Sequence, residues 1–273
     1  MALLPEIAGA LAAIKAKRPL IHHLTNYVTA NDSANITLAV GASPVMASDP
    51  SEAVDMAAHA AALVLNIGTL SAAAVDTMVA AGKRAAELGI PVVFDPVGAG
   101  ATPARTAAAH RIVREVPLAV LRGNAAEIRT VAGLDAGIKG VDAVGGETGG
   151  EAVACGLSRK LGCVVAISGR VDIIAGGGRV GRIANGHPWL ANVTGTGCMA
   201  TSLIGCCCGA TADPFVAAAG GLAYMGIAGE LAYGSLGLGD GIGTFRARLF
   251  DAVFAMTADT VLRHGKIDCN REE

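Results

Sequence analysis

Aromatic and charged side chains are scarce in this 273-residue sequence, at 3% and 16% of the residues respectively. With so few aromatic residues, the core has to be built from Ala, Val, Ile and Leu, and such residues suit helices packed on a parallel sheet. The formal net charge is only −2, and no cluster of Lys and Arg resembles the footprint of a nucleic-acid-binding protein. We therefore expect no nucleic-acid partner.

Long uninterrupted apolar runs and targeting signals are also missing. Gly, Asp, Asn or Arg breaks each apolar stretch before it could span a bilayer, so we expect no membrane partner. The first residues, Met-Ala-Leu-Leu-Pro-Glu, carry no basic region of the kind that opens a secretory signal. These features predict a cytoplasmic protein.

The seven cysteines include no Cys-x-x-Cys motif, which removes the usual basis for a zinc site. Their odd number argues against a disulfide framework. The consecutive cysteines at 206–208 would point in three directions from a helix, so we expect them to be small buried hydrophobic residues. Cys198 is different because a glycine-rich turn precedes it.

Two common nucleotide-binding motifs are absent as well. There is no Gly-x-x-x-x-Gly-Lys-Ser/Thr sequence, which excludes a P-loop enzyme. The first third of the chain has no Gly-x-Gly-x-x-Gly sequence, so a nicotinamide site is unsupported.

The sequence does contain an alternation of helical and strand-like segments. Strands are expected at 19–24, 44–46, 62–68, 91–97, 118–123 and 163–169, with an antiparallel pair at 172–175 and 179–184. Helices are expected at 3–17, 31–40, 51–61, 71–88, 102–115, 149–161, 196–208, 213–233 and 243–264. Continuous apolar strands separated by helices predict an α/β fold, with a mostly parallel sheet covered by helices on both faces.

The domain organisation is expected to be simple. Neither a linker nor an internal repeat is visible, so residues 1–273 are predicted to form one domain. The glycine-rich segment 137–150 is expected to be a mobile loop or a change of register between elements.

The segment 192–198, Asn-Val-Thr-Gly-Thr-Gly-Cys, is the most informative part of the chain. A Gly-Thr-Gly turn that opens into a helix exposes several backbone N–H groups at the positive end of the helix dipole. Such a site suits an anion, above all a phosphate or a phosphoryl group in transfer. The sequence therefore predicts a phosphate cradle formed by Thr194, Gly195, Thr196 and Gly197, with Cys198 where a reacting group would meet the anion.

Mostly polar or charged residues lie at the carboxyl ends of six of the expected strands. They are Thr25 and Asn26, Met46, Asn66 and Gly68, Asp95, 122–127, and 168–170. Ligands of open parallel sheets bind beyond the carboxyl ends of the strands, so we expect these residues to line one site. Arg122 can supply a cation for phosphate oxygens, and the carboxylates of Asp95 and Glu127 suit Mg²⁺ held through water. The set predicts phosphoryl-transfer chemistry.

Six distinctive segments between about residues 20 and 210 carry a family resemblance. They are 23–29, 41–46, 66–70, 95–100, 122–128 and 193–198. With these segments in this order, the sequence resembles the hydroxyethylthiazole kinases of thiamine salvage, which belong to the ribokinase-like superfamily. The resemblance implies a ribokinase-like fold, ATP and Mg²⁺ as cofactors, and 4-methyl-5-(2-hydroxyethyl)thiazole as substrate. It also implies a homotrimer with each substrate pocket at a subunit interface.

The resemblance also implies a role for individual residues. Arg122 and Ser168 would contact ATP, and Asn124 and Thr194 are assigned to the same nucleotide site. Met46 and Gly195 would contact the thiazole, and Asn26 and Gly68 would line its pocket. Asp95 and Glu127 would lie near the magnesium and the phosphates.

Cys198 occupies the position at which most ribokinase-like enzymes carry a catalytic Asp. An Asp can accept the substrate hydroxyl proton directly, whereas a thiol with a pKa of about 8.5, lowered at a helix N-terminus, is a mediocre base. Phosphoryl transfer relies chiefly on positioning and charge stabilisation. We therefore expect the backbone N–H groups of 195–198 to contribute more to catalysis than the thiol does.

Three other functions stay open. One is a ribokinase-like kinase of another small heterocyclic alcohol, such as a hydroxymethylpyrimidine. The second is a cysteine hydrolase in which Cys198 is the nucleophile and His22, His23 or His187 is the base. The third is a module that binds a thiazole or a nucleotide without catalysis.

Overall fold

The computed structural model describes residues 3–134 and 147–272. Six parallel strands form the larger part of its sheet, namely β1 (Leu20–Leu24), β2 (Ser43–Val45), β3 (Ala62–Asn66), β4 (Val92–Asp95), β5 (Val120–Asn124) and β6 (Val164–Ser168). Three antiparallel strands extend it, namely β7 (Asp172–Gly176), β8 (Arg179–Ile183) and β9 (Ile267–Arg271). The strand order is β2-β1-β3-β4-β5-β6-β7-β8-β9. The prediction of a mostly parallel sheet is confirmed.

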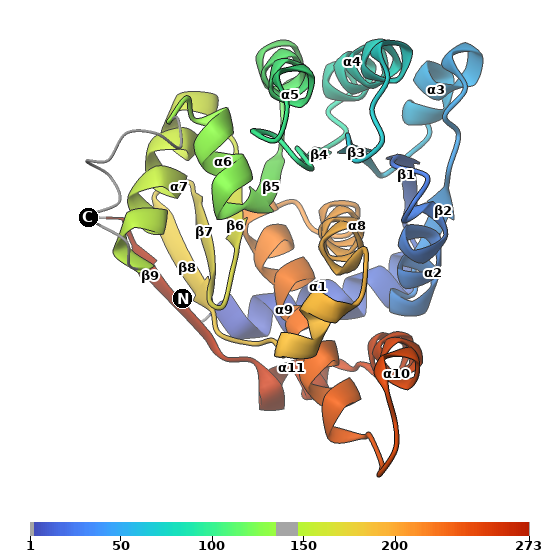
Figure 1. Cartoon of the computed structure of the whole chain (residues 1–273), viewed down its shortest axis with the longest axis vertical. Helices are drawn as coiled ribbons and strands as arrows, with labels where there is room; N and C mark the ends of the chain where they lie inside the picture. Colours follow the sequence, from blue (N-terminus) through green and yellow to red (C-terminus); the bar gives the residue numbers. More distant parts are fainter. Residues whose placement is uncertain (1–2, 135–146, 273) are drawn as a thin grey trace.

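Helices cover both faces of the sheet (Figure 1). One face carries α1 (Leu3–Lys17), α2 (Ala30–Val40), α8 (Thr196–Cys208), α9 (Pro214–Gly234), α10 (Ile242–Ala255) and α11 (Ala258–His264). The other carries α3 (Pro50–Ala57), α4 (Ala72–Glu87), α5 (Pro103–Glu115), α6 (Ala125–Val131) and α7 (Glu147–Leu161). A short 3₁₀ helix, η2 (Pro188–Asn192), precedes α8.

The alternation of side chains along β3 shows why its sequence is apolar throughout. Ala62 and Val64 pack into the core beneath α8 and α9, while Leu63 and Leu65 pack into the core on the opposite face. Because a strand with both faces covered has no solvated side, each of its residues is buried. Only Asn66, the last residue of the strand, is polar, and it lies at the edge where the site is built.

Several local signals in the sequence act as expected. Gly41 ends α2 in the left-handed conformation, with φ 103°, and Asp49 caps α3 through its side chain. The helix expected at 31–40 begins one residue earlier, at Ala30, and Thr29 is its N-cap residue.

The C-terminal part of the chain differs most from expectation. The single helix expected at 243–264 is two helices, because Thr257 leaves the helical conformation and forms a capping box with Thr260 at the start of α11. The chain then adds β9, a largely exposed edge strand whose sequence Ile-Asp-Cys-Asn-Arg gives little apolar signal. The short helix α6 was also not expected. Of the predicted glycine-rich loop at 137–150, residues 135–146 lie outside the described residues.

The long apolar helix α9 belongs to the core. It is the one helix in residues 3–134 and 147–272 that is long and apolar enough to cross a membrane, but 89% of its apolar window is buried inside the protein. It packs on α8, which in turn lies against β3 and β4. This packing brings the first turn of α8 to the carboxyl ends of the parallel strands.

Candidate active site

The glycine turn before α8 forms the centre of the site. Gly195 is the N-cap residue with φ 90°, and a Cβ at this position would lie 2.7 Å from Cγ2 of Thr29. The first backbone bond within the helix runs from the N–H of Met199 to the carbonyl of Gly195, at 2.8 Å. The preceding N–H groups, those of 196–198, therefore have no acceptor in the helix and lie at its positive end. The predicted glycine turn and helix start are therefore present, while their role as an anion cradle stays a prediction.

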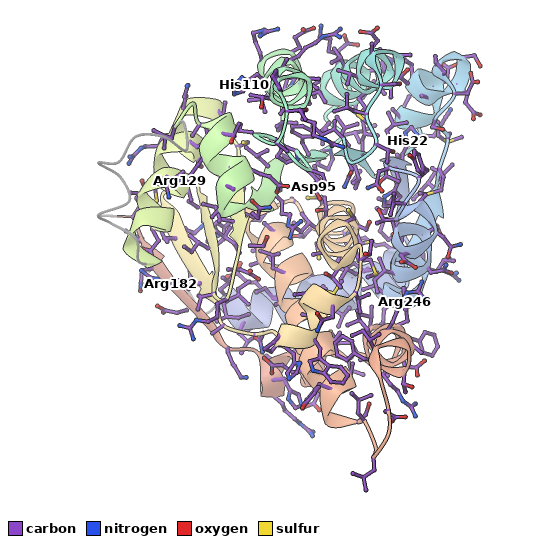
Figure 2. The ribbon with its side chains drawn as sticks, viewed as in Figure 1. His22, Asp95, His110, Arg129, Arg182 and Arg246 are labelled. Atoms are coloured by element: carbon purple, nitrogen blue, oxygen red, sulfur yellow. The ribbon has the colours of Figure 1, made fainter. Side chains whose placement is uncertain are left out.

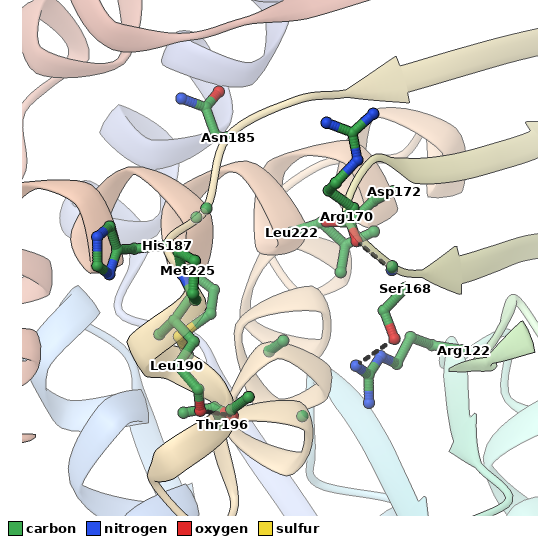
Figure 3. Close-up of a pocket in the computed structure, with 17 residues that line it drawn as sticks. Arg122, Ser168, Arg170, Asp172, Asn185, His187, Leu190, Thr196, Leu222 and Met225 are labelled. Carbon is green, nitrogen blue, oxygen red and sulfur yellow. Dashed lines mark hydrogen bonds between the residues drawn. The ribbon is translucent and has the colours of Figure 1, made fainter. Parts of the chain in front are cut away.

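A buried cation faces this cradle. Arg122, on β5, is 9% exposed, and its Nη2 donates to Oγ of Ser168 at 2.8 Å (Figure 3). Its Nη1 forms an ion pair with Oδ2 of Asp95 at 3.4 Å. A Cβ on Gly197 would come 2.8 Å from Nη1, so the guanidinium can approach the first turn of α8 only because residue 197 has no side chain. The structure thus brings Arg122, Ser168, Asp95 and Gly197 together.

Asp95, the last residue of β4, is fully buried near the centre of the molecule (Figure 2). Its Oδ2 accepts hydrogen bonds from Oγ1 of Thr201 at 2.7 Å and from Nδ2 of Asn66 at 3.3 Å. Within the described chain its Oδ1 is buried without a partner. Burial raises the pKa of this carboxyl to about 6, against the opposing effects of Arg122 and Thr201.

Glu127 lies beside this group but has a local structural role. Its Oε2 accepts from the N–H of Asn124 at 2.8 Å, while the Asn124 side chain accepts from the N–H of Glu127 at 2.9 Å. This capping box begins α6. Its Oε1 accepts from the N–H of Gly98 at 2.8 Å, which ties the loop after β4 to the same helix. Asn124 itself is exposed.

Cys198 is half-buried and held by two asparagine amides. Its Sγ accepts from Nδ2 of Asn66 at 3.2 Å and from Nδ2 of Asn26 at 3.5 Å. Burial raises the pKa of the thiol, and the neighbouring Asp95 carboxylate raises it further. The expected lowering of this pKa at a helix N-terminus is therefore wrong, because desolvation and a nearby negative charge outweigh the helix dipole.

Asn66, which was expected at the site, makes a further contact there, whereas Arg105 was not among the predicted site residues. Asn66 also accepts from the N–H of Gly68 at 2.9 Å. Arg105, in the first turn of α5, donates to the carbonyls of Ile67, Val97 and Gly68 at 2.8–2.9 Å and so holds together the loops after β3 and β4. The signal for Asn66 was its place as the one polar residue of an otherwise apolar strand, whereas Arg105 gave no signal.

The remaining predicted residues lie around the same edge. Asn26 is buried, and its Oδ1 accepts from the N–H and Oγ1 of Thr29. Met46 follows the edge strand β2 and is half-buried. Thr194 is exposed immediately before the cradle, while Oγ1 of Thr196 donates to the carbonyl of Leu190 and anchors α8 to η2.

A cavity of about 540 Å³ opens from the cradle between β6, η2, α8 and α9. Arg122 and Ser168 line one side of it, and Thr196 lies beside Leu190 on another (Figure 3). Arg170, Asp172, Leu222, Met225 and the segment 185–188 also line it. The cavity therefore combines charged groups with apolar side chains, as small-molecule sites commonly do.

The three histidines proposed as a hydrolase base are held elsewhere. Nε2 of His22 lies 2.7 Å from the carbonyl of Ala47, and burial lowers the pKa of His23 to about 3. His187 stacks on Tyr233, with ring centroids 3.7 Å apart. In the residues described, Cys198 has amide partners and no imidazole partner. The geometry gives no support to a cysteine hydrolase.

Solved structures of low sequence identity share this fold. A ribokinase-like superfamily protein from Enterococcus faecalis is 12% identical, with a TM-score of 0.57 over 92% of this chain and 81% of that chain. A pyridoxal kinase from Staphylococcus aureus is 13% identical, with a TM-score of 0.57 over 93% of this chain and 98% of that chain. The fold is therefore ribokinase-like.

Sequence relatives narrow the class to one family. A model of the hydroxyethylthiazole kinase family matches residues 11–259. A hydroxyethylthiazole kinase from Alkaliphilus oremlandii is 49% identical, over 98% of this chain and 99% of the relative. The structure of such a kinase protein from Pyrococcus horikoshii is 37% identical, with a TM-score of 0.89 over 97% of this chain and 99% of that chain. The chain belongs to the hydroxyethylthiazole kinase family, and membership of a kinase family implies the use of ATP.

Proposed function

We propose that this chain is a single-domain, cytoplasmic kinase that transfers the γ-phosphoryl group of ATP to the hydroxyl of 4-methyl-5-(2-hydroxyethyl)thiazole for thiamine salvage. One observation carries the proposal beyond family membership. A buried guanidinium, Arg122, and a helix N-terminus, at 195–198, converge on the mouth of the cavity. Two sources of positive charge at one point are what a transferring phosphoryl group needs.

We assign the cavity to ATP. Arg122 and Ser168 would contact its phosphates, since their polar groups line the cavity next to Gly197. Thr194 and Asn124 are exposed, and we assign them to the same nucleotide site. The apolar side chains of Leu222 and Met225, which also line the cavity, suit an adenine ring.

The acidic residues fit a magnesium ion that is held mainly by water and phosphate. No group of three or more His, Cys, Asp and Glu suited to a metal occurs in residues 3–134 and 147–272, so a cage made of protein alone is not supported. Mg²⁺ usually keeps several waters and takes one or two carboxylates. Asp95 offers a buried Oδ1 without a partner, and we propose that it holds the hydrated ion together with Glu127. When bound, the ion would supply positive charge to the phosphate oxygens.

We place the thiazole at the other side of the cradle, against Cys198 and Gly195. Asn26 and Gly68 would line this pocket, and Met46 would contact the ring from the edge of the sheet. The surface there is apolar and open, since Tyr27 is 83% and Val28 58% exposed. Exposed apolar patches mark interaction sites, and we propose that this one is covered by a neighbouring copy in a homotrimer.

In the proposed reaction the substrate oxygen forms a bond to the γ-phosphorus while the bond to the ADP oxygen breaks. Cys198 keeps its own proton at neutral pH, because burial and Asp95 raise the pKa of its thiol. We therefore assign the substrate hydroxyl proton to a phosphoryl oxygen rather than to Sγ. The N–H groups of 196–198 and the guanidinium of Arg122 stabilise the charge that develops on the phosphoryl group.

The test is ADP formation by the purified protein, with and without the thiazole alcohol, at several Mg²⁺ concentrations. We expect ADP and phosphorylated thiazole in equal amounts, with no turnover when Mg²⁺ is chelated. A higher kcat/KM for hydroxymethylpyrimidine would favour the alternative substrate. No alcohol-dependent turnover at all would favour a binding module. Sedimentation equilibrium would test the trimer, and cell fractionation the location.

A further inference from the structure

The side-chain amide of Asn66 uses every hydrogen-bonding position that an amide has. Its Oδ1 accepts from Nδ2 of Asn26 at 2.9 Å and from the N–H of Gly68 at 2.9 Å. Its Nδ2 donates to Sγ of Cys198 at 3.2 Å and to Oδ2 of Asp95 at 3.3 Å. Two donors and two acceptor lone pairs are the full capacity of the group.

The orientation of this amide is fixed by its neighbours. The backbone N–H of Gly68 can only donate, so Oδ1 of Asn66 has to face it. Nδ2 then necessarily faces Cys198 and Asp95. Asn66 is 2% exposed, so water cannot replace a lost partner without a change of the packing around it.

The four partners belong to separate parts of the molecule. Asn26 follows β1, Gly68 follows β3, Asp95 ends β4 and Cys198 lies in the first turn of α8. Asn66 thus joins three strand ends to the helix whose N–H groups form the cradle. In the proposed function these same partners line the thiazole pocket, carry the magnesium and contact the reacting group.

We propose that Asn66 is a positioning residue for phosphoryl transfer, whose amide holds the first turn of α8 and the Asp95 carboxylate in register. The inference rests on the proposed function for the identity of the alcohol and for the roles of Asp95 and Cys198. A misplacement of reacting groups by about 1 Å can lower a rate roughly 10²-fold. Loss of the amide donors therefore lowers kcat, while the nucleotide cavity, to which Asn66 does not contribute, keeps its affinity for ATP.

The first test is Asn66→Asp, which preserves shape and the acceptor toward Gly68, but replaces both N–H donors by an oxygen and adds a carboxyl group beside Asp95. We expect kcat to fall roughly 10²-fold while the KM for ATP changes less than about threefold. Asn66→Ser provides a smaller, uncharged second variant. Asn270→Asp is the matched control, because Asn270 is exposed on β9, away from the cradle, and its activity should equal that of the wild type.

A double-mutant cycle separates positioning from mere stability. A carboxylate at residue 198 would accept charge-assisted hydrogen bonds from the same amides. Asn66→Ser should therefore lower kcat by a larger factor in the Cys198→Asp background than in the wild type. In the Cys198→Ala background it should lower kcat by a smaller factor. Equal costs in all three backgrounds, or a loss explained wholly by a lower melting temperature, would overturn the proposal. If the wild type prefers another alcohol, the cycle is run with that alcohol, so the two proposals fail separately.

Discussion

The guanidinium of Arg122 lies directly against the backbone of Gly197, so that a Cβ at residue 197 would come 2.8 Å from Nη1. Arg122 is held on its other side by Ser168 and Asp95. The cation and the helix N-terminus can therefore act on one anion only while residue 197 is glycine. The site depends on this close approach as much as on any charged group.

Gly197→Ala should displace Arg122 and lower kcat/KM for ATP by about 10–10²-fold, as expected for a misplaced phosphate contact. Steady-state kinetics with varied ATP would measure this. The matched control is Gly156→Ala on α7, where an added Cβ meets nothing within 4 Å. That change should leave activity intact and raise stability by about 0.5–1 kcal/mol, since alanine favours a helix. Full activity in Gly197→Ala would show that the close approach is not required.

Cys198→Ser should keep most of the activity, because the thiol holds its proton at neutral pH and the backbone supplies the charge stabilisation. A loss beyond about 10⁴-fold, the upper range for general-base catalysis, with substrate binding intact would contradict this. If residue 198 occupies a base site, Cys198→Asp should keep or raise kcat, since Asn26 and Asn66 present donors to a carboxylate at this position. Complete inactivity of the folded Asp variant would count against a base site here.

Glu127→Ala should remove the capping box of α6 and the tie to Gly98, and should raise the Mg²⁺ concentration needed for half-maximal activity. The cost in stability is expected to be about 1 kcal/mol, as for other lost caps. Thr260→Ala, in the capping box of α11, is the control, because it should cost similar stability without a change in Mg²⁺ dependence. If both variants lose similar stability and neither changes the Mg²⁺ concentration needed for half-maximal activity, Glu127 has only a structural role.

The contribution of His23 to stability should fall as the pH drops from 6.5 toward 3. Burial lowers the pKa of His23 to about 3, so the folded state stays neutral while the unfolded chain takes up a proton. The contribution is at most about 1.4 kcal/mol per pH unit in this window. Asp95 and Asp172 act in the opposite direction. Burial raises the pKa of each carboxyl to about 6, so the stability that these two groups contribute falls as the pH rises from 3.8 to that value.

A comparison of variants separates the effect of His23 on the pH dependence of stability from that of the buried carboxyl groups. Urea unfolding gives the free energy of unfolding at pH 7.5 and at pH 5. On going from pH 7.5 to pH 5, His23→Gln should lose less of this free energy than the wild type does. His59→Gln, at an exposed position, should leave the wild-type difference unchanged. An undiminished difference in His23→Gln would mean that other groups cause the acid sensitivity.

Much of the sheet was accessible from sequence because its strands are short apolar runs with a polar residue at the end. In β3, for example, apolar side chains on both faces and Asn66 at the end gave both the strand and its place at the site. The start of α8 at Thr196 was also predicted, since a Gly-Thr-Gly turn favours a helix start. By contrast, β9 has few apolar residues and is a strand because β8 offers it an edge to pair with.

The site shows the same division. The sequence alone determined which residues end the parallel strands and that a glycine turn opens α8, because both are local patterns of apolar and small residues. Tertiary structure alone decided that Asn66 holds Cys198 and that Arg122 packs on Gly197. It also decided that the pKa of the Cys198 thiol is raised rather than lowered. These properties depend on burial and on contacts between segments that are distant in the sequence. Local sequence patterns do not determine either of them.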